Sequence, residues 1–137
     1  MNKQTQEMLS RLERCGISTD DAMALRRISM TLHRWHELEC GDDTGYIERD
    51  DTTGKPYHVR QWFSPSAQKW ITSRYIVPDR GSGALRRLAA IMARYPALRS
   101  YVQGDPRGAS LYILRPDDVP VGGSDDAYYS RGVAVYK

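Results

Sequence analysis

The period of the hydrophobic pattern changes twice along this chain, and that change limits the fold more than any other feature. Apolar residues recur every three or four positions in residues 19–40 and again in residues 83–95, a spacing typical of helices that bury one face. Between these segments, residues 45–77 alternate apolar and polar side chains over short runs, as strands do. The chain must therefore combine helices with a sheet.

Two helices are predicted near the start of the chain. A short helix covers residues 3–15 and is closed by Gly16, because glycine favours the left-handed backbone at a helix end. The second helix begins after Ser18 or Thr19, which are good N-terminal caps, and ends near Gly41.

A third helix follows residues 78–82 and stops at Pro96, because proline lacks the amide donor. The stripes expected to be buried are Leu25, Ile28, Leu32 and Trp35 in the second helix, and Leu85, Leu88, Met92 and Tyr95 in the third. Opposite these stripes lie Arg27, Arg34, Arg87 and Arg94. Residues 24–28 and 84–88 are similar, either through duplication or because amphipathic helices of similar composition converge. On both interpretations the helices present arginines outward.

The strands are predicted at residues 45–51, 55–62, 69–77, 110–115 and 131–136. Short turns between strands favour antiparallel pairing. The expected fold is α+β, an antiparallel sheet of about five strands with the two longer amphipathic helices and the short N-terminal helix packed mainly on one face. At 137 residues, the chain 1–137 is expected to form a single domain.

Several classes of protein are excluded by composition. No apolar run approaches the roughly 20 residues that span a bilayer, and the first residues are too polar for a secretory signal. We therefore expect a cytoplasmic protein without a membrane partner. Cys15 and Cys40 are too few for a disulfide framework and lack the paired spacing of a zinc site. The sequence predicts no cofactor and no catalytic residues.

Charge is distributed unevenly along the chain. Residues 60–107 hold nine basic side chains against two acidic ones, whereas residues 37–51 hold seven acidic side chains against one basic. If the fold separates the two signs, the basic side attracts phosphate or an acidic protein surface. If the two segments pack together, they neutralise each other.

Two glycine-rich turns carry arginines. Arg107 lies between Gly104 and Gly108, and Arg80 precedes the third helix. Such sequences are typical of turns. They also place a guanidinium beside backbone amides that bind anions. Neither segment has the glycine spacing of a phosphate-binding loop.

The leading hypothesis is a non-enzymatic protein that binds nucleic acid, or an acidic patch of a host defence protein, through an arginine-rich surface. The proposed surface consists of Arg74, Arg80, Arg87, Arg94, Arg107 and Arg131. The alternative is a protein that sequesters a nucleotide signal, with Arg80, Arg107 and Arg131 around the phosphates and Tyr112 stacking on the base. A third hypothesis is a metal-dependent nuclease that uses Glu48, Asp50 and His58 as ligands.

Five segments of the chain resemble a family of small proteins carried by tailed phages and prophages. The similar segments are residues 25–41, 47–57, 78–85, 104–108 and 129–135. The resemblance implies a bacterial cytoplasm and an accessory role. Since small accessory phage proteins often block host defences, it further implies a counter-defence activity of the anti-CRISPR kind.

Overall fold

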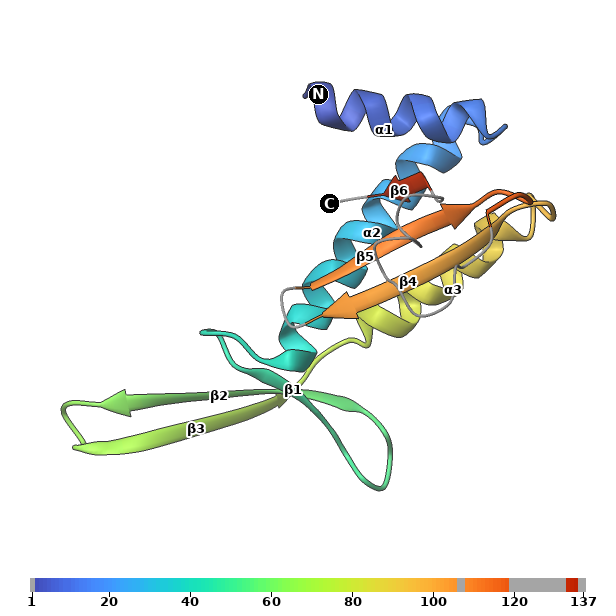
Figure 1. Ribbon diagram of the computed structural model, residues 1–137. Coiled ribbons are helices and arrows are strands. Elements are labelled where there is room, and N and C mark those ends of the chain that lie inside the picture. Colours follow the sequence, from blue (N-terminus) through green and yellow to red (C-terminus); the bar gives the residue numbers. More distant parts are fainter. Residues whose placement is uncertain (1, 106–107, 119–132, 136–137) are drawn as a thin grey trace.

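The computed structural model describes residues 2–105, 108–118 and 133–135 (Figure 1). Its elements follow in the order α1 (Lys3–Arg14), α2 (Thr19–Cys40), β1 (Tyr46–Arg49), β2 (Pro56–Ser64), β3 (Lys69–Ile76), α3 (Arg80–Met92), β4 (Arg99–Asp105), β5 (Gly108–Leu114) and β6 (Val133–Val135). All pairs of adjacent strands are antiparallel, and the helices pack against strands. The predicted α+β class is confirmed.

The strands form two sheets, and the expectation of a single sheet was wrong. β1, β2 and β3 make one antiparallel sheet, and β4, β5 and β6 make the other. α3 separates the two sets of strands along the chain. The first sheet meets α2 only near the C-terminal end of that helix, whereas the second lies along it (Figure 1).

β4 is a strand that the sequence pattern did not predict. Val102 is its only aliphatic residue, so the alternation of apolar and polar side chains is weak. The strand pairs with β5 along its whole length, from Arg99 opposite Leu114 to Asp105 opposite Gly108. Pairing with a buried neighbour therefore decides its conformation.

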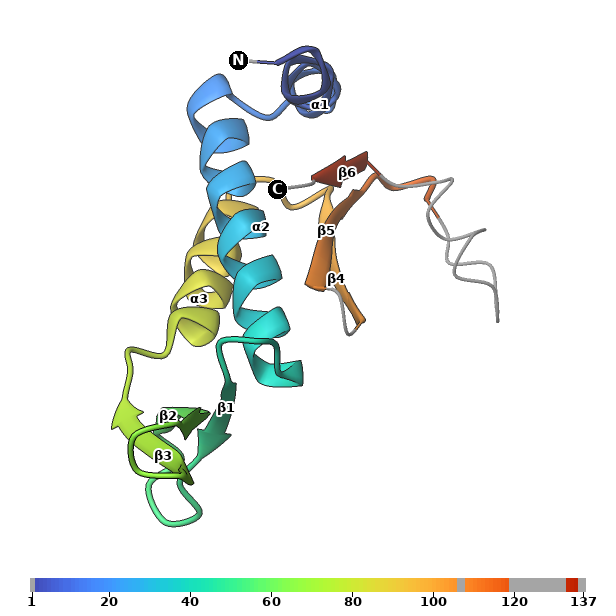
Figure 2. The same cartoon turned by 90° about the vertical axis from the view of Figure 1, so that its left-hand side faces the viewer.

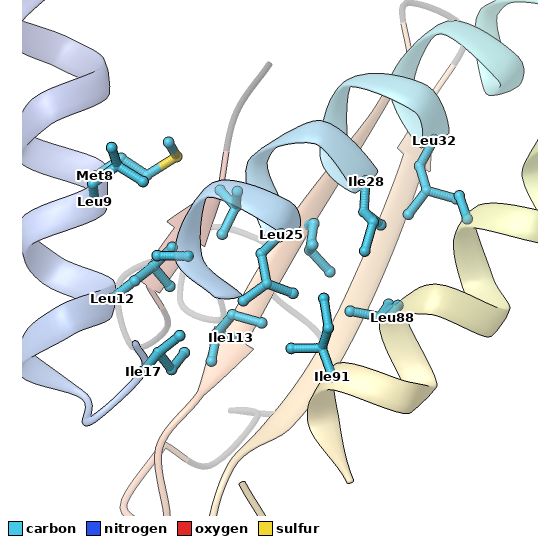
Figure 3. Close-up of a cluster of buried hydrophobic side chains, with 14 residues drawn as sticks. Met8, Leu9, Leu12, Ile17, Leu25, Ile28, Leu32, Leu88, Ile91 and Ile113 are labelled. Atoms are coloured by element: carbon cyan, nitrogen blue, oxygen red, sulfur yellow. The ribbon is translucent and has the colours of Figure 1, made fainter. Parts of the chain in front are cut away.

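The main core lies between the second sheet and the helices. α2 and α3 lie side by side on one face of this sheet, and α1 crosses the first turns of α2 (Figure 2). Figure 3 shows the apolar side chains that meet there, among them Leu12, Leu25, Ile28, Leu88, Ile91 and Ile113. Burial of each such side chain contributes roughly 1.5 to 3 kcal/mol, so this cluster holds the layers together.

The second helix has the predicted ends and the predicted buried stripe. The Oγ atom of Ser18 accepts a hydrogen bond from the amide of Asp21, and Gly41 adopts a φ of 92° after the last turn. The stripe of Leu25, Ile28, Leu32 and Trp35 is buried. Ser29 is also buried, and its hydroxyl donates to the carbonyl of Val135 at 2.5 Å. This bond ties α2 to the edge strand β6.

The third helix is rotated relative to the expected stripe. Leu85, expected to be buried, is 49% exposed, and the helix instead buries Gly81, Ala84, Leu88 and Ile91. Gly81 lies against the ring of Trp35, where a side chain would collide with the indole. The absence of a side chain at this position therefore allows α3 to approach α2 closely and sets its rotation.

The first sheet extends away from the helices (Figure 1). β2 and β3 pair from Tyr57 opposite Ile76 to Ser64 opposite Lys69, whereas β1 covers only the first part of β2, as far as Val59. Residues 60–73 therefore form a two-stranded ribbon beyond β1. We call this ribbon the arm.

Candidate functional site

Five arginines from α2, α3 and the residues just after α3 line two neighbouring cavities that share Thr31, and we treat the two cavities together as one groove. Arg27 and Arg34 lie seven residues apart on α2, and the same interval separates Arg80 from Arg87 on α3 and Arg87 from Arg94 just after it. Seven residues of α-helix rise about 10.5 Å, close to two turns, so residues at this spacing share one side of a helix. The groove runs between the two helices and continues to the base of the first sheet. We call it the arginine groove.

The groove contains two adjoining cavities. The upper cavity, of about 510 Å³, is lined by Arg27, Arg87 and Arg94, with Ala24, Ile28 and Ala90 between them. The lower cavity, of about 430 Å³, is lined by Arg34, Arg80 and Trp35 and reaches His58 at the base of the arm. Thr31 lines both cavities. The arginines thus surround a floor made largely of apolar side chains.

Two of the five arginines already contact carboxylates of the same chain. Arg34 Nη1 lies 2.6 Å from Asp42 Oδ2, and Arg94 Nη2 lies 2.5 Å from Asp21 Oδ1. Both arginine side chains remain at least half exposed. Among the described residues, no carboxylate lies within ion-pair distance of Arg27, Arg80 or Arg87. Three guanidinium groups therefore face the groove uncompensated.

Hydrogen bonds further stabilise the charged form of Asp21 and Asp42, the carboxylates that pair with Arg94 and Arg34. The hydroxyl of Tyr95 donates to Asp21 and, together with Arg94, lowers the pKa of that carboxyl. Bonds from Thr44 and Arg34 lower the pKa of Asp42 to about 2. Both carboxylates are thus charged at neutral pH and reduce the positive potential at two places in the groove.

Arg74, predicted as part of the surface, lies outside the groove. It belongs to β3, where its guanidinium stacks 3.8 Å from the ring centre of Tyr57 and its Nη2 atom lies 3.6 Å from Glu48 Oε1. The fold therefore joins Arg80, Arg87 and Arg94, but not Arg74.

Tyr112 cannot serve as the exposed stacking residue that the nucleotide hypothesis needs. Its side chain is 3% exposed in the middle of β5, opposite Tyr101 and Ala134. Arg107 and Arg131, assigned to the same hypothesis, lie outside the described residues.

The three ligands of the nuclease hypothesis do not converge. Glu48 is opposite Tyr57 and His58 is opposite Ile47, so the two side chains leave opposite faces of the sheet. Asp50 lies beyond β1, and its Oδ1 atom accepts bonds from the amides of Thr52 and Thr53. The part of the chain that the structure describes contains no group of three or more His, Cys, Asp or Glu residues suited to a metal ion.

Sequence reasoning placed Arg27 and Arg34 outside the site, although it recognised that they face away from the core. Their interval of seven residues, matched in α3, is the signal that could have identified them. Sequence reasoning also left the aromatic residues of the arm out of the site. Trp62, Phe63 and Trp70 are exposed.

None of the helices in the described part of the chain has the length and apolarity needed to cross a bilayer. A scan against protein-family models, a search of curated proteins and a search of solved structures each found no match.

Proposed function

We propose that this chain is a non-enzymatic nucleic-acid-binding protein and that the arginine groove contacts the phosphate backbone. The observation that carries the proposal is the convergence of Arg27, Arg34, Arg80, Arg87 and Arg94 on one groove. Guanidinium groups bind phosphate through paired hydrogen bonds, and release of counterions from the nucleic acid drives such binding.

The balance of charge in the groove supports this proposal. Arg27, Arg80 and Arg87 are exposed and have no carboxylate partner among the described residues. Because these guanidinium groups make no ion pair with a described carboxylate, their paired hydrogen-bond donors are available to an external phosphate.

The phage resemblance supplies a setting for this binding. We propose that the protein acts in a bacterial host cell, as a phage accessory protein that competes for nucleic acid with a defence complex. An acidic patch on the defence complex itself is the alternative partner for the same arginines.

A second candidate function depends on the lower cavity alone. Its volume of about 430 Å³ lies in the range of small-ligand sites. Arg34 and Arg80 could hold the phosphates of a sequestered nucleotide there. Native mass spectrometry of the protein purified from bacteria would show a bound nucleotide, lost in Arg80→Gln, if this candidate is correct.

The test of the main proposal is binding to a fluorescent duplex DNA and to a single strand of the same length, measured by anisotropy at several salt concentrations. The triple variant Arg27→Gln, Arg80→Gln, Arg87→Gln should lower affinity at least tenfold. Each lost phosphate contact should also reduce the slope of log affinity against log salt by about one.

The matched control removes three basic residues from α1, Lys3, Arg11 and Arg14, and changes net charge by the same amount. None of these residues lines the arginine groove. If both triple variants weaken binding equally, the effect is one of overall charge and the groove is not the site. If the wild-type protein binds no nucleic acid, the proposal is wrong and the acidic protein partner replaces it.

A further inference from the structure

The arm exposes large aromatic side chains at its far end. Trp70 is 71% exposed, Phe63 is 49% exposed and Trp62 is 44% exposed. Phe63 and Trp70 are cross-strand neighbours in an edge-to-face arrangement, with ring centres 5.8 Å apart. Aromatic residues normally bury most of their surface, and clusters left in solvent mark interaction sites.

These aromatic residues lie on both faces of the ribbon. Neighbouring residues of a strand point to opposite sides, so Trp62 lies on one face while Phe63 and Trp70 lie on the other. A platform that stacks single-stranded bases needs one face only. Exposure of both faces suits a binding partner that encloses the ribbon from two sides.

The positive charge of the arm favours an anionic binding partner. Residues 52–78 contain no aspartate or glutamate. The two cations of the arm, Arg60 and Lys69, both belong to the face that carries Trp62. A second copy of the chain would bring these cations together, whereas an anionic partner would pair with them.

Duplex DNA has a groove with these properties. Its major groove is about 12 Å wide, admits a two-stranded β-ribbon and has phosphates along both rims. Thymine methyl groups within it offer apolar contacts. From Arg60 to Ser64 the ribbon extends about 13 Å at the usual rise per residue, longer than the roughly 8.5 Å depth of the groove.

We propose that the arm enters the major groove of duplex DNA, with Trp62, Phe63 and Trp70 against base edges and Arg60 and Lys69 toward the phosphates. This inference builds on the proposed nucleic-acid-binding function and assigns a second contact, separate from the arginine groove. The lower cavity reaches from Arg80 to His58 at the base of the arm, so the two contacts adjoin each other.

The test uses a 24-base-pair duplex of mixed sequence. Dimethyl sulfate methylates guanine N7, which lies in the major groove. Wild-type protein should protect guanine N7, and the variant Trp62→Ser, Phe63→Ser, Trp70→Ser should lose this protection and bind at least tenfold more weakly. Leu85→Ser is the matched control, since Leu85 is 49% exposed on α3 outside the arm. Circular dichroism should show that both variants keep the wild-type helix content.

The outcomes separate this inference from the proposed function. If the arm variant binds the duplex as tightly as wild type while the triple arginine variant does not, the arm inference is wrong and the groove function stands. Preference for the single strand, a dimer that disappears in the arm variant, or binding to phosphatidylglycerol vesicles without N7 protection would each overturn the inference. Absence of any binding to nucleic acid would overturn both.

Discussion

Asp79 connects Arg49 of β1 to the first turn of α3. Its Oδ2 atom lies 2.8 Å from Arg49 Nη1, and its Oδ1 atom accepts a hydrogen bond from the amide of Ser82 at 3.1 Å. One carboxylate thus caps the helix that carries Arg80 and Arg87 and also holds the base of the arm. The position of the arm relative to the arginine groove therefore depends on this residue.

Replacement of Asp79 should separate its two roles. Asp79→Ala removes both the cap and the ion pair and should lower the free energy of unfolding by about 2 kcal/mol. Asp79→Asn keeps a good capping side chain and should lose about half as much. Urea denaturation at pH 7 measures both values. Equal losses in the two variants would mean that the cap contributes nothing.

The stability of the protein should fall in acid partly through the same residue. The Arg49 guanidinium, with help from Ser82, lowers the pKa of Asp79 to about 2, below the ordinary value near 3.9. The contribution of the charged form is thus complete above about pH 4 and is lost as the pH falls toward 2. The wild-type protein and Asp79→Asn should therefore differ by about 1 kcal/mol at pH 6 and converge near pH 2 in urea denaturation. A constant difference would contradict the assignment.

Close packing of α2 and α3 should make Gly81 intolerant of substitution. A Cβ atom there would lie 2.4 Å from Trp35 Cδ1, so Gly81→Ala should destabilise the protein by about 1 to 3 kcal/mol. Gly83→Ala is the matched control, since its nearest neighbour would be Arg87 Nη1 at 3.5 Å. It should be neutral or stabilise by up to about 1 kcal/mol. Thermal unfolding of the two variants tests the prediction.

The hydroxyl of Ser29 should contribute to stability because it is buried and paired. Ser29→Ala leaves the carbonyl of Val135 without this donor and should cost about 1 to 3 kcal/mol. Ser10→Ala, at an exposed position of α1, should change stability by less than about 0.5 kcal/mol. Guanidinium denaturation measures the stability of the two variants, and equal midpoints would show that the hydrogen bond of Ser29 makes no net contribution to stability.

Release of Arg94 from Asp21 should strengthen nucleic-acid binding. Asp21→Asn removes the charge that pairs with Arg94 at one end of the groove. We expect affinity for duplex DNA to rise about threefold to tenfold in anisotropy measurements at moderate salt. Asp20→Asn is the control, because it removes the same charge from the neighbouring position. Among the described residues, the carboxylate that Arg94 contacts is Asp21 and not Asp20, so this variant should have a smaller effect. An equal rise in both variants would assign the gain to overall charge.

The strongest periodic signals correctly predicted several elements of the fold. The stripe of α2, the capping by Ser18 and the hairpin of β1 and β2 follow from local rules of spacing and turn chemistry. The division into two sheets and the rotation of α3 do not follow from such local rules, because they depend on contacts between distant residues. Gly81 against Trp35 is such a contact, and neither residue indicates the other in the sequence.

The candidate site was predicted only in part for the same reason. Arg80 and Arg87 share one side of α3, so their place on one side of the helix follows from helical spacing, and Arg94 follows in the turn after the helix. The carboxylate partners of these arginines cannot be predicted from helical spacing, since the pairing of Arg94 with Asp21 joins residues 73 positions apart. Exposure of Trp62 and Trp70 likewise depends on the end of β1, which leaves the outer part of the hairpin without a third strand.

The open end of the hairpin allows its length to vary independently of the core. Removal of one residue from each strand would exchange the sides on which the aromatic rings lie, because orientation alternates at every position. Removal of two from each strand would shorten the ribbon by about 7 Å and restore the original orientation. Related chains could therefore tune how far the hairpin reaches through insertions or deletions of even size, while the helices and the second sheet remain unchanged.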